Sequence, residues 1–196
     1  MTDSPLIIAA RQWVIDKYPY NSTHLLKALE WLDRIAPDAS EAVRLATLTH
    51  DMERAFPGPD QPILARIDGL EIEDEYNKLH SARSAWMVGK WLSEQGADET
   101  LVDEVERLID AHEVGGWPEA NLVQAADSLS FLETNIDLFL GFVRSGRFPA
   151  SEVRRKFDYS HDRIQVDSAR GAVTAPAWSR WFARLIQINK ACDAVR

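Results

Sequence analysis

The chain has very little cysteine, with Cys192 alone among 196 residues. A single cysteine cannot form an internal disulfide, which excludes a disulfide-stapled scaffold and fits a reducing compartment. No apolar run reaches the roughly 18 to 20 residues that a membrane-spanning helix needs. The N-terminus lacks a basic segment followed by an apolar stretch and a cleavage site, so we expect no signal peptide. Together these absences predict a cytoplasmic protein that has no membrane partner.

Positive charge is also scarce. The 22 lysine and arginine residues face 31 aspartate and glutamate residues, which gives a formal net charge of −9 at pH 7. Non-specific binding to nucleic acid or to an anionic membrane requires clustered positive charge, so we expect neither as a partner. A small phosphorylated substrate stays compatible with this charge, because a bound metal ion would supply positive charge locally.

Hydrophobic residues make up 45% of the chain, which is enough for a full core. No stretch shows the alternation of a strand, and no repeat or linker divides the chain. We therefore expect one domain over residues 1–196, an all-α bundle of about seven or eight helices. The apolar periodicity and the cap residues predict helices over residues 5–17, 22–35, 40–51, 74–95, 98–112 and 118–144, another that Pro149 opens, and an aromatic-rich last helix with Trp178 and Trp181. Residues 55–74 predict a long loop and residues 171–176 a turn.

One stretch, Leu45 to Arg54, combines an apolar helix with charged chemistry. Residues 42–48 are nearly all apolar and contain no glycine or proline, which predicts a buried helix. His50 and Asp51 then stand side by side at its end, where burying an unpartnered charge is costly. A metal ion bound by both side chains would remove that cost. The alternative is a helix that surfaces into the loop after it. Within this stretch Arg54 falls on a face next to Asp51, and Glu53 points away.

Four more residues suit a metal site, although each has a simpler explanation. His24 lies in the first turn of a helix and His80 near the start of another, where histidine is usually just exposed. His112 continues the apolar stripe of its helix, where a backbone carbonyl could satisfy it. Asp127 sits among small apolar residues and needs a cation or several donors. Helix bundles build metal sites from such inward-facing residues, and imidazole with carboxylate suits manganese, iron, cobalt or zinc.

The ordered set resembles the HD-domain superfamily of metal-dependent phosphohydrolases over roughly residues 20–135. The residues that carry the resemblance are His24, His50, Asp51, His80, His112 and Asp127. It implies that His24, His50, Asp51 and Asp127 bind one divalent ion. It further implies that His80 and His112 complete a second site that Asp51 bridges, with paired ions ~3.5 to 4 Å apart.

The resemblance also implies a function: hydrolysis of a phosphate ester or anhydride in a small molecule, with a nucleotide as the expected substrate. One or two divalent ions (Mn, Fe, Co, Mg or Zn) would lower the pKa of bound water and offset phosphoryl charge. Asp51 and Arg54 would be the catalytic residues. Arg54 stands where many relatives carry a substrate-contacting lysine, and its fork suits phosphate. Arg83, one turn after His80, is a second phosphate candidate; a surface salt bridge is the alternative.

A second His-Asp pair, His161-Asp162, lies in a polar stretch that no apolar run introduces. We do not expect it to bind the metal. Lys156, Tyr159 and Arg163 around it have helical spacing and could face substrate, although a solvated basic face is the simpler explanation.

Two other functions fit the same six residues. Di-iron oxygenases of the superfamily, which act on inositol or phosphonates, share the ligand pattern, and Tyr18 or Tyr20 could cover an iron site here. A non-catalytic HD-like regulatory module is the other alternative. The sequence leaves the substrate, the native metal and the oligomeric state open.

Overall fold

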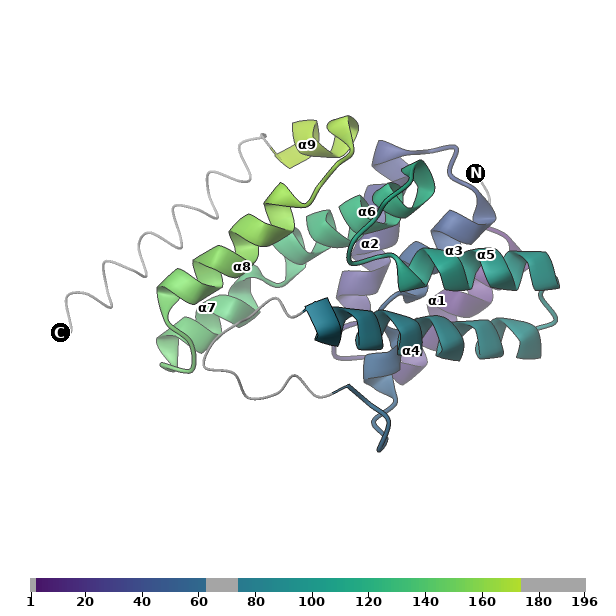
Figure 1. Ribbon diagram of the computed structural model, residues 1–196, viewed down its shortest axis with the longest axis horizontal. Coiled ribbons are helices and arrows are strands. Elements are labelled where there is room, and N and C mark those ends of the chain that lie inside the picture. Colours follow the sequence, from purple (N-terminus) through teal and green to yellow (C-terminus); the bar gives the residue numbers. More distant parts are fainter. Residues whose placement is uncertain (1–2, 63–73, 174–196) are drawn as a thin grey trace.

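The computed structural model describes residues 3–62 and 74–173 (Figure 1). In this part of the chain every regular element is a helix, which confirms the all-α prediction. The elements are α1 (Pro5–Lys17), α2 (Ser22–Ile35), α3 (Glu41–Thr49), the 3₁₀ helix η1 (Met52–Ala55), α4 (Asp74–Glu94), α5 (Glu99–Asp110), α6 (Pro118–Thr134), α7 (Ile136–Arg144), α8 (Ala150–Asp162) and α9 (Asp167–Val173). No described helix is long and apolar enough to cross a membrane.

Helix α3 lies at the centre of the fold. Eight of its nine residues are buried, and it packs against α1, α2, α5 and α6. The Ser40 hydroxyl caps its first turn by accepting a hydrogen bond from the backbone N–H of Val43 at 3.3 Å. Leu45 and Leu48 are fully buried, and such burial contributes about 1.5–3 kcal/mol for each side chain. The buried helix predicted from residues 42–48 is thus confirmed, and it fixes where the chain delivers His50.

Helix α6 joins two apolar cores. Val123 and Ala126 pack into the core that α1 to α5 form, and Leu129 and Leu132 pack into the core shared with α7, α8 and α9. Figure 1 shows α6 running between the two groups of helices. Asp127 lies on α6 between these two sets of side chains, so any site built around it lies where the two cores meet.

The helix predicted over residues 118–144 is in fact two helices, α6 and α7, which raises the number above the seven or eight expected. The break falls at Asn135, whose side-chain oxygen accepts a hydrogen bond from the Thr134 hydroxyl at 2.8 Å. The Thr134 hydroxyl also donates to the backbone carbonyl of Ser130 at 2.8 Å, and such side-chain bonds give the helix backbone an alternative partner. The break lets α7 pack against both α6 and α8.

The remaining differences concern loops. Met52–Ala55, which includes the start of the predicted loop, forms η1, and residues 56–62 have no helix; residues 63–73 lie outside the described residues. The turn predicted over residues 171–176 begins inside α9. Its remainder, and the last helix predicted around Trp178 and Trp181, lie outside the described residues.

Candidate metal centre

Side chains from five separate segments meet beside α3. They come from the first turn of α2, the end of α3, the middle of α4, the turn after α5 and the middle of α6, and they are His24, His50, Asp51, His80, His112 and Asp127. None of the six is more than 7% exposed. The sequence placed all six on inward faces or at helix ends, and the structure brings all six together.

The first of two overlapping clusters contains His24, His50, Asp51 and Asp127. Nε2 of His24 lies 3.1 Å from Oδ1 of Asp127, and Nε2 of His50 lies 3.3 Å from the same oxygen. His24, His50 and Asp51 each present a ligand atom, and these three atoms lie within 4.8 Å of one another. A divalent ion needs donors that can close to about 2.0–2.2 Å around one point, which this spacing permits with small adjustments.

The second cluster contains Asp51, His80 and His112, whose ligand atoms also lie within 4.8 Å of one another. Oδ1 of Asp51 is 2.9 Å from Nε2 of His80, and the rings of His80 and His112 are 5.3 Å apart. Asp51 belongs to both clusters, so it occupies the bridging position that the resemblance implied.

Hydrogen bonds behind the histidines set their tautomers. Nδ1 of His50 donates to the carbonyl oxygen of Thr47 at 2.9 Å, and Nδ1 of His112 donates to that of Ile109 at 2.6 Å. Nδ1 of His80 donates to the Glu53 carboxylate at 2.9 Å. Because carbonyl and carboxylate oxygens only accept, Nδ1 of each ring carries a proton, and Nε2 is the nitrogen left to bind a metal ion when the ring is neutral. This is how proteins orient histidines that bind metals.

Several buried nitrogens in the centre lack a hydrogen-bond partner. They are Nδ1 of His24, Nε2 of His50 and Nε2 of His112. A buried polar atom left unpaired costs about 1–3 kcal/mol, so an arrangement with several of them calls for a ligand. Borderline divalent ions such as Mn²⁺, Fe²⁺, Co²⁺ or Zn²⁺ bind imidazole nitrogen and carboxylate oxygen together. The residues therefore fit a metal ion.

The electrostatics of the centre also favour a cation. Burial opposes the charged form of His50, but the carboxylates of Asp127 and Asp51 outweigh it and raise the pKa of this ring to about 9. Burial instead lowers the pKa of His112 to about 4. The ring of His112 is therefore neutral at pH 7, the state that a histidine needs to bind a metal. Positive charge is thus stabilised beside Asp127 and Asp51.

Arg163 holds the far side of Asp127. Its guanidinium pairs with Oδ2 of Asp127 and with the Glu113 carboxylate, and its Nε donates to the Ser128 hydroxyl at 2.7 Å. Burial raises the pKa of the Asp127 carboxyl, but Arg163 outweighs burial and keeps that pKa well below its usual range. Arg163 was predicted to contact substrate; it lines the pocket described next and also orients Asp127.

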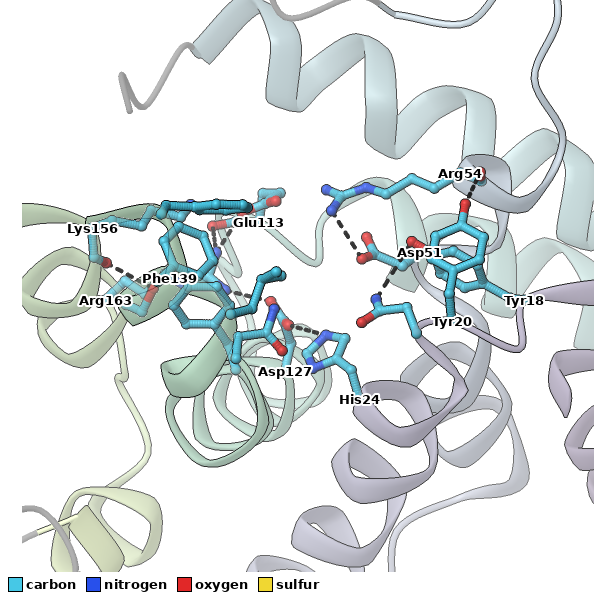
Figure 2. Close-up of a pocket in the computed structure, with 16 residues that line it drawn as sticks. Tyr18, Tyr20, His24, Asp51, Arg54, Glu113, Asp127, Phe139, Lys156 and Arg163 are labelled. Atoms are coloured by element: carbon cyan, nitrogen blue, oxygen red, sulfur yellow. Dashed lines mark hydrogen bonds and ion pairs between the residues drawn. The ribbon is translucent and has the colours of Figure 1, made fainter. Parts of the chain in front are cut away.

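A pocket of about 320 Å³ opens beside the first cluster (Figure 2). One side presents Arg54 and Asp51, and the other presents Lys156, Arg163 and Phe139. The lining residues are polar at the centre and aromatic or apolar toward α7: Tyr18, Tyr20, Asn21, His24, Asp51, Arg54, Glu113, Asp127, Phe131, Asn135, Leu138, Phe139, Phe142, Lys156, Ser160 and Arg163. A ligand in this pocket would contact His24, Asp51 and Asp127 directly.

Two predicted substrate contacts, Arg54 and Lys156, line this pocket. Nη1 of Arg54 is 3.2 Å from Oδ2 of Asp51, and its Nε is buried with no hydrogen-bond partner. Nζ of Lys156 lies over the rings of Phe131 and Tyr159, at 5.7 and 5.5 Å from their centroids, and forms no ion pair with the described residues. Burial lowers the pKa of Lys156. Both side chains have donors free for an anion.

Arg83, the other predicted phosphate contact, does not line this pocket. Its guanidinium donates to the Glu53 carboxylate at 2.7 Å and to the carbonyl oxygen of Phe56 at 2.8 Å, and it pairs with Asp60 at 3.0 Å. Arg83 therefore forms a salt bridge, which was the alternative to a phosphate contact.

Glu53 and Glu113 are the functional neighbours that the sequence did not reveal. The prediction that Glu53 points away is wrong: Glu53 is fully buried and joins His80 to Arg83. Helical spacing failed there because the chain leaves α3 and forms the tighter η1, which rotates Glu53 inward. Glu113 directly follows His112 in a turn, and an acidic residue next to a candidate ligand was the available signal.

The second His-Asp pair lies elsewhere. The side chains of His161 and Asp162 are 37% and 77% exposed, and Nδ1 of His161 bonds to the Asp162 carboxylate at 2.8 Å. Among the described residues, neither belongs to a cluster of potential metal ligands. Of the two tyrosines, Tyr18 is buried at the pocket, whereas Tyr20 is mostly exposed and donates to the carbonyl oxygen of Arg54 at 3.0 Å.

Comparisons with curated proteins and with solved structures each find no match. A family described as a domain of unknown function, DUF4202, matches residues 8–146. That segment carries all six candidate ligands and Arg54, whereas Lys156 and Arg163 lie beyond it. Because the match covers well over half of the chain, the protein belongs to the DUF4202 family.

Proposed function

We propose that the protein is a metal-dependent phosphohydrolase of the HD-domain type that acts on a small phosphorylated molecule. One observation carries the proposal: buried imidazole nitrogens without partners surround Asp51 and Asp127, and this cluster opens into a pocket that also holds Arg54 and Lys156. A metal ion next to donors for an anion is the arrangement that phosphoryl transfer requires.

When bound, a divalent ion supplies Lewis-acid chemistry, because it lowers the pKa of coordinated water and offsets charge on the phosphoryl oxygens. His24, His50, Asp51 and Asp127 would hold it. The unpartnered Nε–H of Arg54 and the ammonium of Lys156 would donate to phosphate oxygens from opposite sides of the pocket (Figure 2). Holding the phosphate in this way fixes its orientation and stabilises the charge that develops during the reaction.

The apolar part of the pocket indicates what the phosphate is attached to. Phe131, Phe139 and Phe142 contribute aromatic rings next to Leu138, and Asn135 adds an amide. A planar base can stack on aromatic rings and use an amide for hydrogen bonds. A nucleotide is therefore the substrate class that we propose to test first, ahead of small sugar phosphates.

Di-iron oxygenase chemistry is the second candidate, and Tyr18 favours it. This tyrosine is 3% exposed, lines the pocket and lies close enough to Asp51 that the carboxylate helps burial to raise the pKa of its phenol. A tyrosine in that place could cover an iron site. The pocket itself speaks against the third possibility, a non-catalytic module, because such a module needs no substrate cavity beside the cluster.

A phosphate-release screen tests the proposal. Protein purified without chelator is supplied separately with Mn²⁺, Co²⁺, Fe²⁺, Mg²⁺ or Zn²⁺, and inorganic phosphate is measured with nucleotides and sugar phosphates. We expect metal-dependent release that EDTA abolishes and that Asp51→Ala lacks. The absence of release from every substrate with every metal would refute the hydrolase, and oxygen consumption with Fe²⁺ alone would select the oxygenase.

A further inference from the structure

We infer that the guanidinium of Arg54 takes the place of a second metal ion, so that the chain binds one ion, in the cluster of His24, His50, Asp51 and Asp127. The inference rests on the metal site of the proposed function and goes beyond it. It differs from the two-ion arrangement that the resemblance implies, in which Asp51, His80 and His112 hold a further ion.

The contacts of Arg54 carry this inference. Its two terminal nitrogens reach two of the three members of the second cluster: Nη1 is 3.2 Å from Oδ2 of Asp51, and Nη2 is 3.3 Å from Nε2 of His80. Nη2 therefore lies beside the ring nitrogen that a second metal ion would use, and the same nitrogen is 2.9 Å from Oδ1 of Asp51. The planar fork of arginine lets its two terminal nitrogens reach both residues side by side.

Glu53 prepares His80 for this contact. Its carboxylate accepts the Nδ1 proton of His80 at 2.9 Å, and this contact turns Nε2 of the ring toward Asp51 and Arg54. Arg83 holds the other oxygen of Glu53 at 2.7 Å. A series of contacts therefore runs from Arg83 through Glu53 and His80 to Arg54. These contacts fix the position of His80 relative to the guanidinium of Arg54.

The charges around the two clusters also favour a metal ion in the first cluster rather than in the second. Around the second cluster, Asp51 is paired with Arg54, and Glu53 behind His80 is paired with Arg83. In the first cluster, Oδ1 of Asp127 meets only the two imidazoles of His24 and His50. Arg163 pairs with Asp127 through the other oxygen, Oδ2, so Oδ1 still faces the two imidazoles and a dication can reach it, whereas in the second cluster a dication meets a guanidinium that repels it.

Of the three residues in the second cluster, Asp51 and His80 contact Arg54, and no contact between His112 and Arg54 is described. Nε2 of His112 is buried without a hydrogen-bond partner. Removing the charge of Arg54 would thus leave Asp51, His80 and His112 with their donor atoms within 4.8 Å and no cation among them. That set resembles a metal site with open positions, so the variant should accept the second ion that the native chain refuses.

Metal titration of the intact chain tests this directly. Apo protein is equilibrated with Mn²⁺ alone, the free ion is removed by rapid gel filtration, and bound manganese is counted by mass spectrometry. We expect one ion in the native chain and in Arg54→Lys, and two in Arg54→Gln. The electron paramagnetic resonance of Arg54→Gln should show spin-coupled manganese, and Arg54→Gln combined with His112→Ala should return to one uncoupled ion.

The outcomes separate the inference from the proposed function. Two ions in the native chain, or one ion in folded Arg54→Gln, would overturn the inference and leave the metal-dependent hydrolase standing. If the native chain bound no ion, both the inference and the proposed metal-dependent hydrolase would be refuted. Circular dichroism shows which variants are folded, and if Arg54→Gln does not fold, Arg54→Met replaces it with the same expected count of two.

Discussion

The same dipeptide, His-Asp, occurs twice in this chain, and the two copies differ in burial and in the residues that they contact. His50 and Asp51 end a helix whose residues are nearly all buried, and they are 1% and 4% exposed. His161 and Asp162 end α8, and their side chains are 37% and 77% exposed. Asp51 contacts His80, which comes from α4, as well as Arg54 three residues further along, whereas the bond described for His161 goes to its own neighbour.

The difference teaches that position in the fold, rather than the dipeptide, makes the chemistry. A carboxylate in water keeps its hydration shell and has little need of a cation. A buried carboxylate needs partners, and Asp51 has His80 from α4 and Arg54 from η1. Each variant that tests this difference has a matched control residue elsewhere in the fold.

The largest effect is expected at the aspartates of the two pairs. Asp51→Ala should abolish metal retention and lower phosphate release by a factor of about 10³ or more, because even one lost preorganised electrostatic contact costs about 10²–10³. Asp162→Ala should leave both quantities unchanged. The measurements are bound metal per chain and initial rates of phosphate release. Equal losses in the two variants would show that the buried pair has no special role.

The two carboxylates that share Arg83 give the second comparison. Glu53→Ala removes the buried partner of both Arg83 and His80, and breaking such a buried pair costs about 3–5 kcal/mol of unfolding free energy. Asp60 contacts the same arginine but is 62% exposed, so Asp60→Ala should leave the urea midpoint unchanged. A similar shift of the midpoint in both variants would contradict the assigned burial of Glu53.

Two neighbouring basic residues of α8 give the third comparison, because one of them lines the pocket and the other is exposed. Lys156→Met should raise the KM for a phosphorylated substrate by about tenfold, the equivalent of about 1.4 kcal/mol, because one charged hydrogen bond to phosphate is lost. Arg155, its exposed neighbour in the sequence, is the matched control, and Arg155→Met should not change KM. Initial rates over a range of substrate concentrations measure both values. An unchanged KM in Lys156→Met would exclude this lysine from binding substrate.

The smallest effect concerns how each His-Asp helix begins. The Ser40 hydroxyl caps α3, whereas α8 follows Pro149 without a side-chain cap. Ser40→Ala should lower the unfolding free energy by about 1 kcal/mol, and Ser151→Ala in the exposed first turn of α8 should cost less. Thermal and urea unfolding measure the two costs, and the reverse order would show that α3 does not depend on its cap.

Some of the candidate ligands could be predicted from a local rule, whereas His24 and His80 were singled out by the family resemblance. An apolar helix running into His50, or an aspartate among alanines as at Asp127, is visible in a short window of sequence. Helix lengths and caps follow the same kind of rule, which is why most of the described helices agree with the periodicity. The convergence of the six residues then followed from the family resemblance, and the structure agrees with it.

Other features depend on tertiary contacts and could not be predicted in this way. The inward turn of Glu53 requires η1, and the place of Arg83 depends on Phe56 and Asp60 in the following loop. The position of Arg54 against His80 depends on two elements that lie far apart in the sequence. The break at Asn135 interrupts a helical pattern that is otherwise continuous over residues 118–144, so the periodicity alone does not reveal it.

One measurement tests the central claim most directly: anomalous diffraction at the manganese edge from crystals grown with Mn²⁺. The account predicts an anomalous peak between His24, His50, Asp51 and Asp127, with metal-ligand distances near 2.0–2.2 Å. A peak at His161-Asp162, or no peak at the buried centre at saturating Mn²⁺, would contradict it.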